Sequence, residues 1–126
     1  MPGFRLFRRC LLHTGAMANH RSLDARSLAL HERVARRLIE DQHAFAHAQS
    51  TLARWRLHAD ERVQPYLAAW QAIMAEGVQA CIDTMLEDSE RAAALRQASP
   101  FAGLLSNAER FDVLKAWREE QSRAAS

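Results

Sequence analysis

The stretch Asp88-Ser-Glu-Arg-Ala-Ala-Ala-Leu-Arg-Gln-Ala-Ser-Pro-Phe-Ala-Gly-Leu-Leu-Ser-Asn-Ala-Glu-Arg-Phe111 joins the end of one predicted helix to the start of another. Ser99 precedes Pro100, and a residue before proline is driven out of the α region, so the first helix must end by this point. Ser106 and Glu109 form the Ser-x-x-Glu pattern of a capping box, which satisfies unpaired amides at a helix start. The stretch therefore predicts a helix, a sharp interruption and a second helix.

The interruption is apolar, whereas most loops are polar and run over the surface. It carries Phe101, Leu104 and Leu105, and Gly103 between them allows a positive φ. Such a loop is expected to insert either into the core of this chain or into a partner. Six residues form this candidate interaction or structural site: Ser99, Pro100, Phe101, Gly103, Leu104 and Leu105.

Apolar residues recur at helical spacing through the rest of the chain. The pattern predicts helices over 22–39, 41–58 and 66–74, and it resumes over 78–86. Gly77 either caps the third helix or lies inside a longer one. We find no strand-like alternation. The sequence therefore predicts an all-α fold, a compact bundle of five to six helices with the apolar Ser-Pro-Phe-Ala-Gly loop before the last one.

Two helices have faces that predict their packing. Along the second helix, apolar residues step by threes and fours, which predicts a seam against another helix: Phe45, Ala48, Leu52, Trp55 and Ala59. The last helix is expected to start at Ser106 or Asn107 and to fray over 121–126. It is expected to bury some of four apolar residues: Phe111, Val113, Leu114 and Trp117.

Residues 1–16 differ in charge from the rest of the chain. They hold three of the 17 basic residues and none of the 15 acids, so 17–126 carries 14 bases against 15 acids, a net charge of −1. We expect 1–16 to be a disordered extension or an over-extended gene start, and 17–126 to be a single helical domain. The apolar run after Arg9 is too short for a signal peptide, and an amphipathic surface anchor is the remaining alternative.

The two cysteines do not form a disulfide framework. Cys10 lies in the basic extension, and Cys81 lies between Ala80 and Ile82 in a helical pattern, where a buried reduced thiol is expected. This usage favours a cytoplasmic location. No apolar run approaches the length of a membrane span.

A polar stripe follows the second helix through His43, His47, Arg54 and His58, with Ser50 among them. His43 and His47 have the spacing of metal ligands, and Glu40 precedes His43 as in half of a di-iron motif. However, the helical wheel turns both imidazoles away from the apolar seam, whereas di-iron ligands point into the bundle. We therefore expect an exposed stripe that gains positive charge as pH falls and suits an acidic partner.

No catalytic or cofactor motif is evident in the sequence. It contains no Gly-x-Ser-x-Gly, no phosphate-binding glycine loop and no Cys-x-x-Cys. A helix-turn-helix over 88–120 is disfavoured because residues 98–105 make too long a turn and the last helix mixes acids with bases. We therefore expect no enzyme and no cofactor, and regard nucleic acid as an unlikely partner.

Four segments carry a family resemblance: Ser-Leu-Ala-Leu-His-Glu-Arg-Val-Ala (27–35), Leu-Ala-Arg-Trp-Arg (52–56), Gln-Pro-Tyr-Leu (64–67) and the residues from Glu87 to Phe111. They resemble a family of small, mostly uncharacterised bacterial all-helical proteins associated with toxin–antitoxin-type and mobile loci. The likeness covers nearly all of 20–119 and implies a start near Met17. No catalytic residue transfers from the family.

These observations favour a non-enzymatic helical protein-interaction module, antitoxin-like or accessory to a neighbouring gene product. It would act through a protein partner or through self-association. The alternatives are a DNA-associated transcriptional regulator and, less favoured, a metal-binding or enzymatic helical protein.

Overall fold

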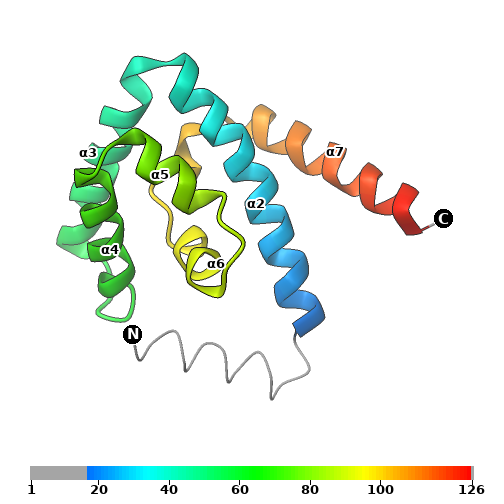
Figure 1. Cartoon of the computed structure of the whole chain (residues 1–126), viewed down its shortest axis with the longest axis horizontal. Helices are drawn as coiled ribbons and strands as arrows, with labels where there is room; N and C mark the ends of the chain where they lie inside the picture. The colour runs from blue at the N-terminus through cyan, green and yellow to red at the C-terminus, as the bar shows by residue number, and fades with distance from the viewer. Residues whose placement is uncertain (1–16, 126) are drawn as a thin grey trace.

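The computed structural model describes residues 17–125, with side chains from Asp24 onward. This part of the chain contains helices and no strand, which confirms the all-α prediction. The elements are α2 (Met17–Glu40), α3 (Gln42–His58), α4 (Gln64–Ala75), α5 (Val78–Met85), α6 (Glu90–Gln97), the short 3-10 helix η1 (Ala102–Leu104) and α7 (Asn107–Ala125) (Figure 1). Residues 1–16, with Cys10 and the expected extension, lie outside the described residues.

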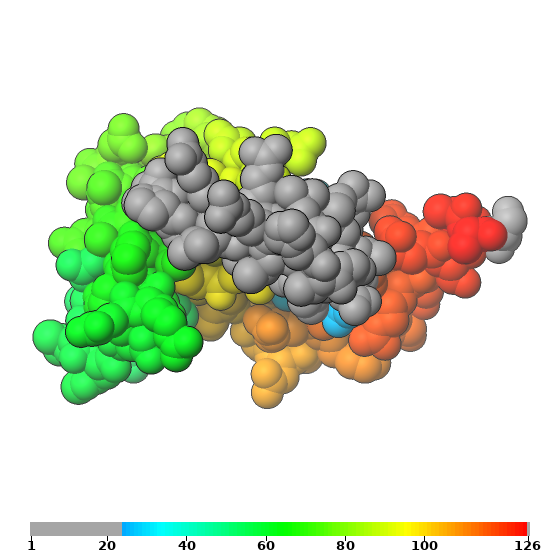
Figure 2. Space-filling view, turned by 90° about the horizontal axis from the view of Figure 1, so that it is seen from below, coloured from blue at the N-terminus to red at the C-terminus, as the bar shows by residue number. Residues whose placement is uncertain are grey.

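Helix α2 organises the bundle, because it packs against α3, α5, α6, α7 and η1. Helix α4 completes the core by packing against α3, α5 and α6. The C-terminal end of α7 extends away from the other helices, whereas α3 and α4 lie at the opposite end of the molecule (Figures 1 and 2). Within 17–125, no helix is both long enough and apolar enough to cross a membrane.

The helix starts follow local sequence signals. Asp41 caps α3, since its side chain accepts the His43 amide at 2.9 Å. Ser89 caps α6 by accepting the Ala92 amide at 3.0 Å. At α7 the predicted capping box is confirmed: the Ser106 amide donates to Glu109 at 3.0 Å, and the Glu109 amide donates to Ser106 Oγ at 3.1 Å.

Gly77 separates α4 from α5. Its φ of 112° lies in the left-handed region, which a residue with a Cβ rarely adopts. Of the two roles open to Gly77, the structure shows a break between helices. The other glycine of interest, Gly103, has no positive φ, because η1 continues through it.

Both outer helices are longer than predicted. α2 begins at Met17 instead of Ser22. α7 continues to Ala125, so the fraying expected from Gln121 is wrong within the described residues. Arg123, Ala124 and Ala125 favour helix, and Arg123 also suits the negative end of the helix dipole.

The predicted seam of α3 is only partly correct. Its buried residues are Ala44, Ala48, Thr51 and Leu52. Trp55 is 38% exposed, and Phe45 and Ala59 are half-buried. Trp55 points in the same direction as the buried residues, but it lies in the last turn of α3, where the packing of neighbouring elements leaves an open pocket.

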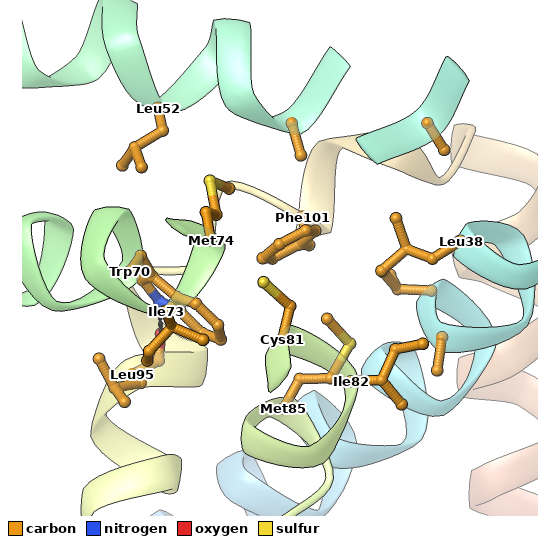
Figure 3. Packing of buried hydrophobic residues seen from close by; sticks show 14 of the residues in the cluster. Leu38, Leu52, Trp70, Ile73, Met74, Cys81, Ile82, Met85, Leu95 and Phe101 are labelled. Atoms are coloured by element: carbon orange, nitrogen blue, oxygen red, sulfur yellow. Dashed lines mark hydrogen bonds between the residues drawn. The ribbon is translucent and has the colours of Figure 1, made fainter. Parts of the chain in front are cut away.

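The centre of the core joins α4, α5, α6 and the loop before α7. Trp70, Leu95 and Phe101 are each 0% exposed, and they lie around Cys81 and Met85 (Figure 3). The Trp70 indole Nε1 donates to the Leu95 carbonyl at 2.8 Å, so the one polar atom of this large side chain is satisfied.

Candidate interaction surface

The apolar loop of residues 99–105 inserts into the core of its own chain. Ser99, Pro100, Phe101 and Leu105 are buried, Leu104 is half-buried and Gly103 is exposed. Ser99 stabilises the loop because its Oγ accepts the Phe101 amide at 3.1 Å. Of the two destinations open to Phe101, a partner or this core, the structure shows the core.

The polar stripe lies along one side of α3, which we call the α3 flank: His43, His47, Ser50, Arg54 and His58. All five residues are exposed. They recur every three to four positions, so they form one continuous line on the helix surface. From His43 to His58 the line is about 22 Å long, at ~1.5 Å per residue.

The two candidate sites from the sequence meet at the first end of the α3 flank. An open pocket of about 280 Å³ lies there, which we call the Leu104 pocket. It is lined by Arg37, Asp41, His43, Ala44, His47, Gly103 and Leu104. The exposed part of the 99–105 loop and the histidines of the flank therefore share one surface, although more than fifty positions separate them in the chain.

A larger open pocket lies at the other end of the flank, and we call it the Trp55 pocket. Its volume is about 450 Å³. Two residues of the flank, Arg54 and His58, border it. The rest of the lining is apolar: Trp55, Ala59, Val63 and Leu67. Val63 is 37% exposed and Leu67 is buried, so the pocket has an apolar floor that opens to solvent.

Among the residues that line the Trp55 pocket, Arg54 carries a full positive charge and His58 is titratable. Residues 42–59 contain two arginines, three histidines and no acid. Arg54 Nη2 lies 3.4 Å from Thr51 Oγ1, and Arg56 Nη1 lies 3.5 Å from the Gln64 carbonyl. Neither arginine is among the ion pairs of the described residues.

The nearest acid in sequence, Asp60, is engaged within its own turn. The Arg62 amide donates to Asp60 Oδ1 at 2.9 Å. This bond, with a second one from the Arg62 side chain, holds the pKa of the Asp60 carboxyl below its usual range. The ion pair of Asp60 is with Arg62, at 3.5 Å, and not with Arg54 or Arg56.

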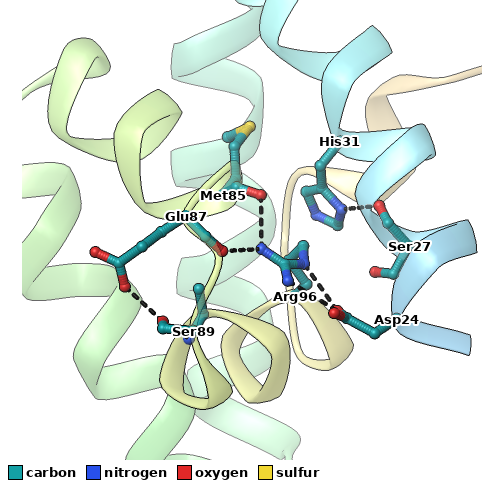
Figure 4. Close-up of polar contacts among 8 residues, drawn as sticks. Asp24, Ser27, His31, Met85, Glu87, Ser89 and Arg96 are labelled. Atoms are coloured by element: carbon teal, nitrogen blue, oxygen red, sulfur yellow. Dashed lines mark hydrogen bonds and ion pairs between the residues drawn. The ribbon is translucent and has the colours of Figure 1, made fainter. Parts of the chain in front are cut away.

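A buried polar cluster, absent from the sequence interpretation, centres on Arg96 (Figure 4). Its side chain is 1% exposed, and its Nη2 lies 2.8 Å from Asp24 Oδ1 on α2. Nη1 donates to the carbonyls of Met85 and Glu87 at 3.0 and 2.9 Å, at the C-terminal end of α5. Arg96 thus joins α2, α5 and α6. Periodicity places it at a helix end but cannot reveal partners that are distant in sequence.

His31 lies close to this cluster and is 1% exposed. Its Nδ1 lies 2.7 Å from the Ser27 carbonyl, so Nδ1 carries the proton, and Nε2 is buried without a partner. Burial, opposed by the bond to Ser27 and reinforced by Arg96, lowers the pKa of His31 to about 4. His31 is therefore a neutral core residue at neutral pH.

The described residues also bear on a metal site and on a helix-turn-helix. No group of three or more His, Cys, Asp or Glu side chains is arranged to hold a metal ion there. Residues 98–106 separate α6 from α7, and Arg110, Lys115 and Arg118 share α7 with Glu109, Asp112, Glu119 and Glu120. This connection is longer than the turn of a helix-turn-helix.

Comparison with known proteins adds no family. No protein-family model, no curated protein and no solved structure matches this chain.

Proposed function

We propose that this chain is a non-enzymatic helical protein-interaction module, antitoxin-like or accessory to the product of a neighbouring gene, and that it binds its partner along the α3 flank. The observation that supports this is the combination of the Trp55 pocket and the Leu104 pocket at the two ends of one exposed helix face. A partner helix lying along the flank would carry an apolar side chain at the Trp55 pocket and polar side chains along the rest of its contact, toward the Leu104 pocket.

The burial of Cys81 and His31, a possible nucleophile and a possible base, also favours binding over catalysis. Burial, with a smaller contribution from Glu76, raises the pKa of Cys81 to about 11, which disfavours the reactive thiolate. His31 is enclosed in the core and lines neither flank pocket. We also propose a cytoplasmic location, which the free, buried thiol of Cys81 supports.

Co-expression with the products of the flanking genes tests this function. Two variants, one at the N-cap of α4 and one within α4, test whether binding uses the Trp55 pocket. Val63→Asp places a carboxylate in the Trp55 pocket, at a helix start where aspartate is tolerated. Ala72→Asp places the same charge at an exposed position that lines none of the pockets described above.

We expect one flanking product to co-purify with the wild type and with Ala72→Asp. Val63→Asp should bind it about tenfold more weakly in calorimetry, which corresponds to about 1.4 kcal/mol of binding free energy. Equal binding by all three proteins would show that the partner does not use this pocket. If no flanking product binds, the neighbouring-gene proposal is wrong.

A further inference from the structure

We infer that the α3 flank receives an acidic amphipathic helix of a partner protein, with a bulky apolar side chain in the Trp55 pocket and carboxylates beside Arg54. This inference rests on the proposed function and adds the chemistry of the partner. It follows from the shape, the charge and the length of the surface.

The shape of the Trp55 pocket suits one bulky apolar side chain of the partner. Trp55 and Val63 are 38% and 37% exposed, which is high for large apolar side chains on either side of a pocket. Leu57 is 77% exposed and lies three residues after Arg54, so it borders the flank on its outer side. A leucine or an aromatic residue in the Trp55 pocket would remove apolar surface from water on both sides of the contact.

The positive charge of the flank favours acidic residues next to that apolar side chain on the partner helix. Arg54 lacks a carboxylate partner among the described residues, and no acid occurs over 42–59, although Asp60 and Glu61 follow directly. Carboxylates on the incoming helix would supply the missing partner of Arg54 and speed the encounter. The other end of the flank is less selective, because Asp41 lines the Leu104 pocket together with Arg37. The acidic side chains are therefore expected near the Trp55 end.

A second copy of this chain fits the surface less well. Two copies related by a two-fold axis along the α3 flank would place Arg54 close to its own counterpart, and like charges repel. Residues 76–90 carry five acids and no base, so they are the acidic segment that a copy would offer. However, α5 has only eight residues, about 12 Å of helix, and such a head-to-tail contact would give rings or open filaments instead of a simple two-fold dimer.

Three synthetic helical peptides of equal length test the inference. They share one leucine pattern and carry glutamate, glutamine or lysine at the flanking positions. Each is titrated into the isotope-labelled full chain, and amide and indole resonances report where it binds. The protein variants are Arg54→Glu on the flank and Arg91→Glu at an exposed position of α6, a helix whose main contacts are with α2, α4 and α5.

The glutamate peptide should shift the Trp55 indole and the amides of 54–59, and it should bind about tenfold more tightly than the glutamine peptide. This preference should shrink at high salt. Arg54→Glu should instead bind the lysine peptide most tightly, whereas Arg91→Glu should keep the preference for the glutamate peptide. Equal affinity for all three peptides, or shifts outside the flank, would overturn the inference.

The inference and the proposed function fail differently. A flanking gene product that binds the wild type and Arg54→Glu equally, but is lost in Val63→Asp, would leave the interaction module and remove the acidic partner. Self-association of the wild type that Arg54→Glu abolishes would identify a second copy as the occupant and overturn the inference. Sedimentation of the wild type and of Arg54→Glu over a range of protein concentrations detects this self-association.

Discussion

The rings of Trp70 and Phe101 meet edge to face, with centroids 5.3 Å apart and planes at 70°. Trp70 comes from α4 and Phe101 from the 99–105 loop, and both are 0% exposed. The contact therefore packs the 99–105 loop, between α6 and α7, against α4. Edge-to-face aromatic pairs contribute stability beyond the area that they bury.

Phe101→Ala should therefore destabilise the fold strongly. We expect a loss of about 3–5 kcal/mol in the free energy of unfolding, because the change removes a buried aromatic ring and leaves a cavity. Leu104→Ala, at a half-buried position of the same loop, is the matched control and should cost about 1 kcal/mol. Urea denaturation measures both. Equal effects of the two changes would contradict the central position of Phe101.

Asp24→Ala should expose the dependence of the fold on the Arg96 cluster. The change leaves a guanidinium that is 1% exposed without its counter-charge, while Asp24 itself is 34% exposed. We expect a loss of about 3 kcal/mol, at the low end for a broken buried pair because the lost carboxylate is partly solvated. Asp83→Ala, at an exposed acid on α5, should change the stability by less than about 0.5 kcal/mol. A small effect at Asp24 would mean that the carbonyls of Met85 and Glu87 suffice to hold Arg96.

His31 should make the protein less stable in acid. Its pKa is about 4 in the folded chain against 6.5 for an unperturbed histidine. The unfolded chain therefore takes up a proton first, and the stability that neutral His31 confers is complete above about pH 6.5 and is lost as pH falls toward 4. The difference corresponds to about 3 kcal/mol.

His31→Leu should flatten this part of the pH profile when urea denaturation is repeated between pH 4 and 7. His43→Leu, an exposed histidine, should leave the profile close to that of the wild type. Parallel profiles for the wild type and His31→Leu would show that other groups cause the acid sensitivity.

Glu109 should control the attachment of α7. Its carboxylate accepts the Ser106 amide, which is the main cause of its lowered pKa, and it also pairs with Arg37 and, at 3.3 Å, with Arg33 on α2. Glu109→Ala removes the cap and both ion pairs. Amides 107–112 should then exchange hydrogen faster, whereas Glu119→Ala, an exposed acid on the same helix, should leave them unchanged. Unaltered exchange in Glu109→Ala would show that apolar contacts of Val113 and Leu114 hold the helix.

The double change His43→Ala and His47→Ala should cost less than about 0.5 kcal/mol, since both side chains are exposed. We also expect the purified wild type to contain no stoichiometric zinc or iron. Metal analysis beside thermal unfolding checks both points. A bound metal that disappears in the double variant would contradict this expectation and restore the metal-binding alternative.

The sequence by itself determined the features that depend on residues close together in the chain. The Ser106–Glu109 capping box and the end of a helix before Pro100 are both local, because each involves backbone groups within a few residues. The spacing of apolar residues was sufficient to predict an all-α fold, since one buried face on a helix produces an apolar residue at every third or fourth position.

Only the tertiary structure decided which parts of those faces are covered. Trp55 continues the apolar seam of α3 yet borders an open pocket, and Phe101 fills the core of its own chain. The Asp24–Arg96 pair and the meeting of Leu104 with His43 and His47 join residues far apart in sequence. Helical periodicity states which side of a helix is apolar, but burial depends on the neighbouring helix, and that is set by packing of the whole chain.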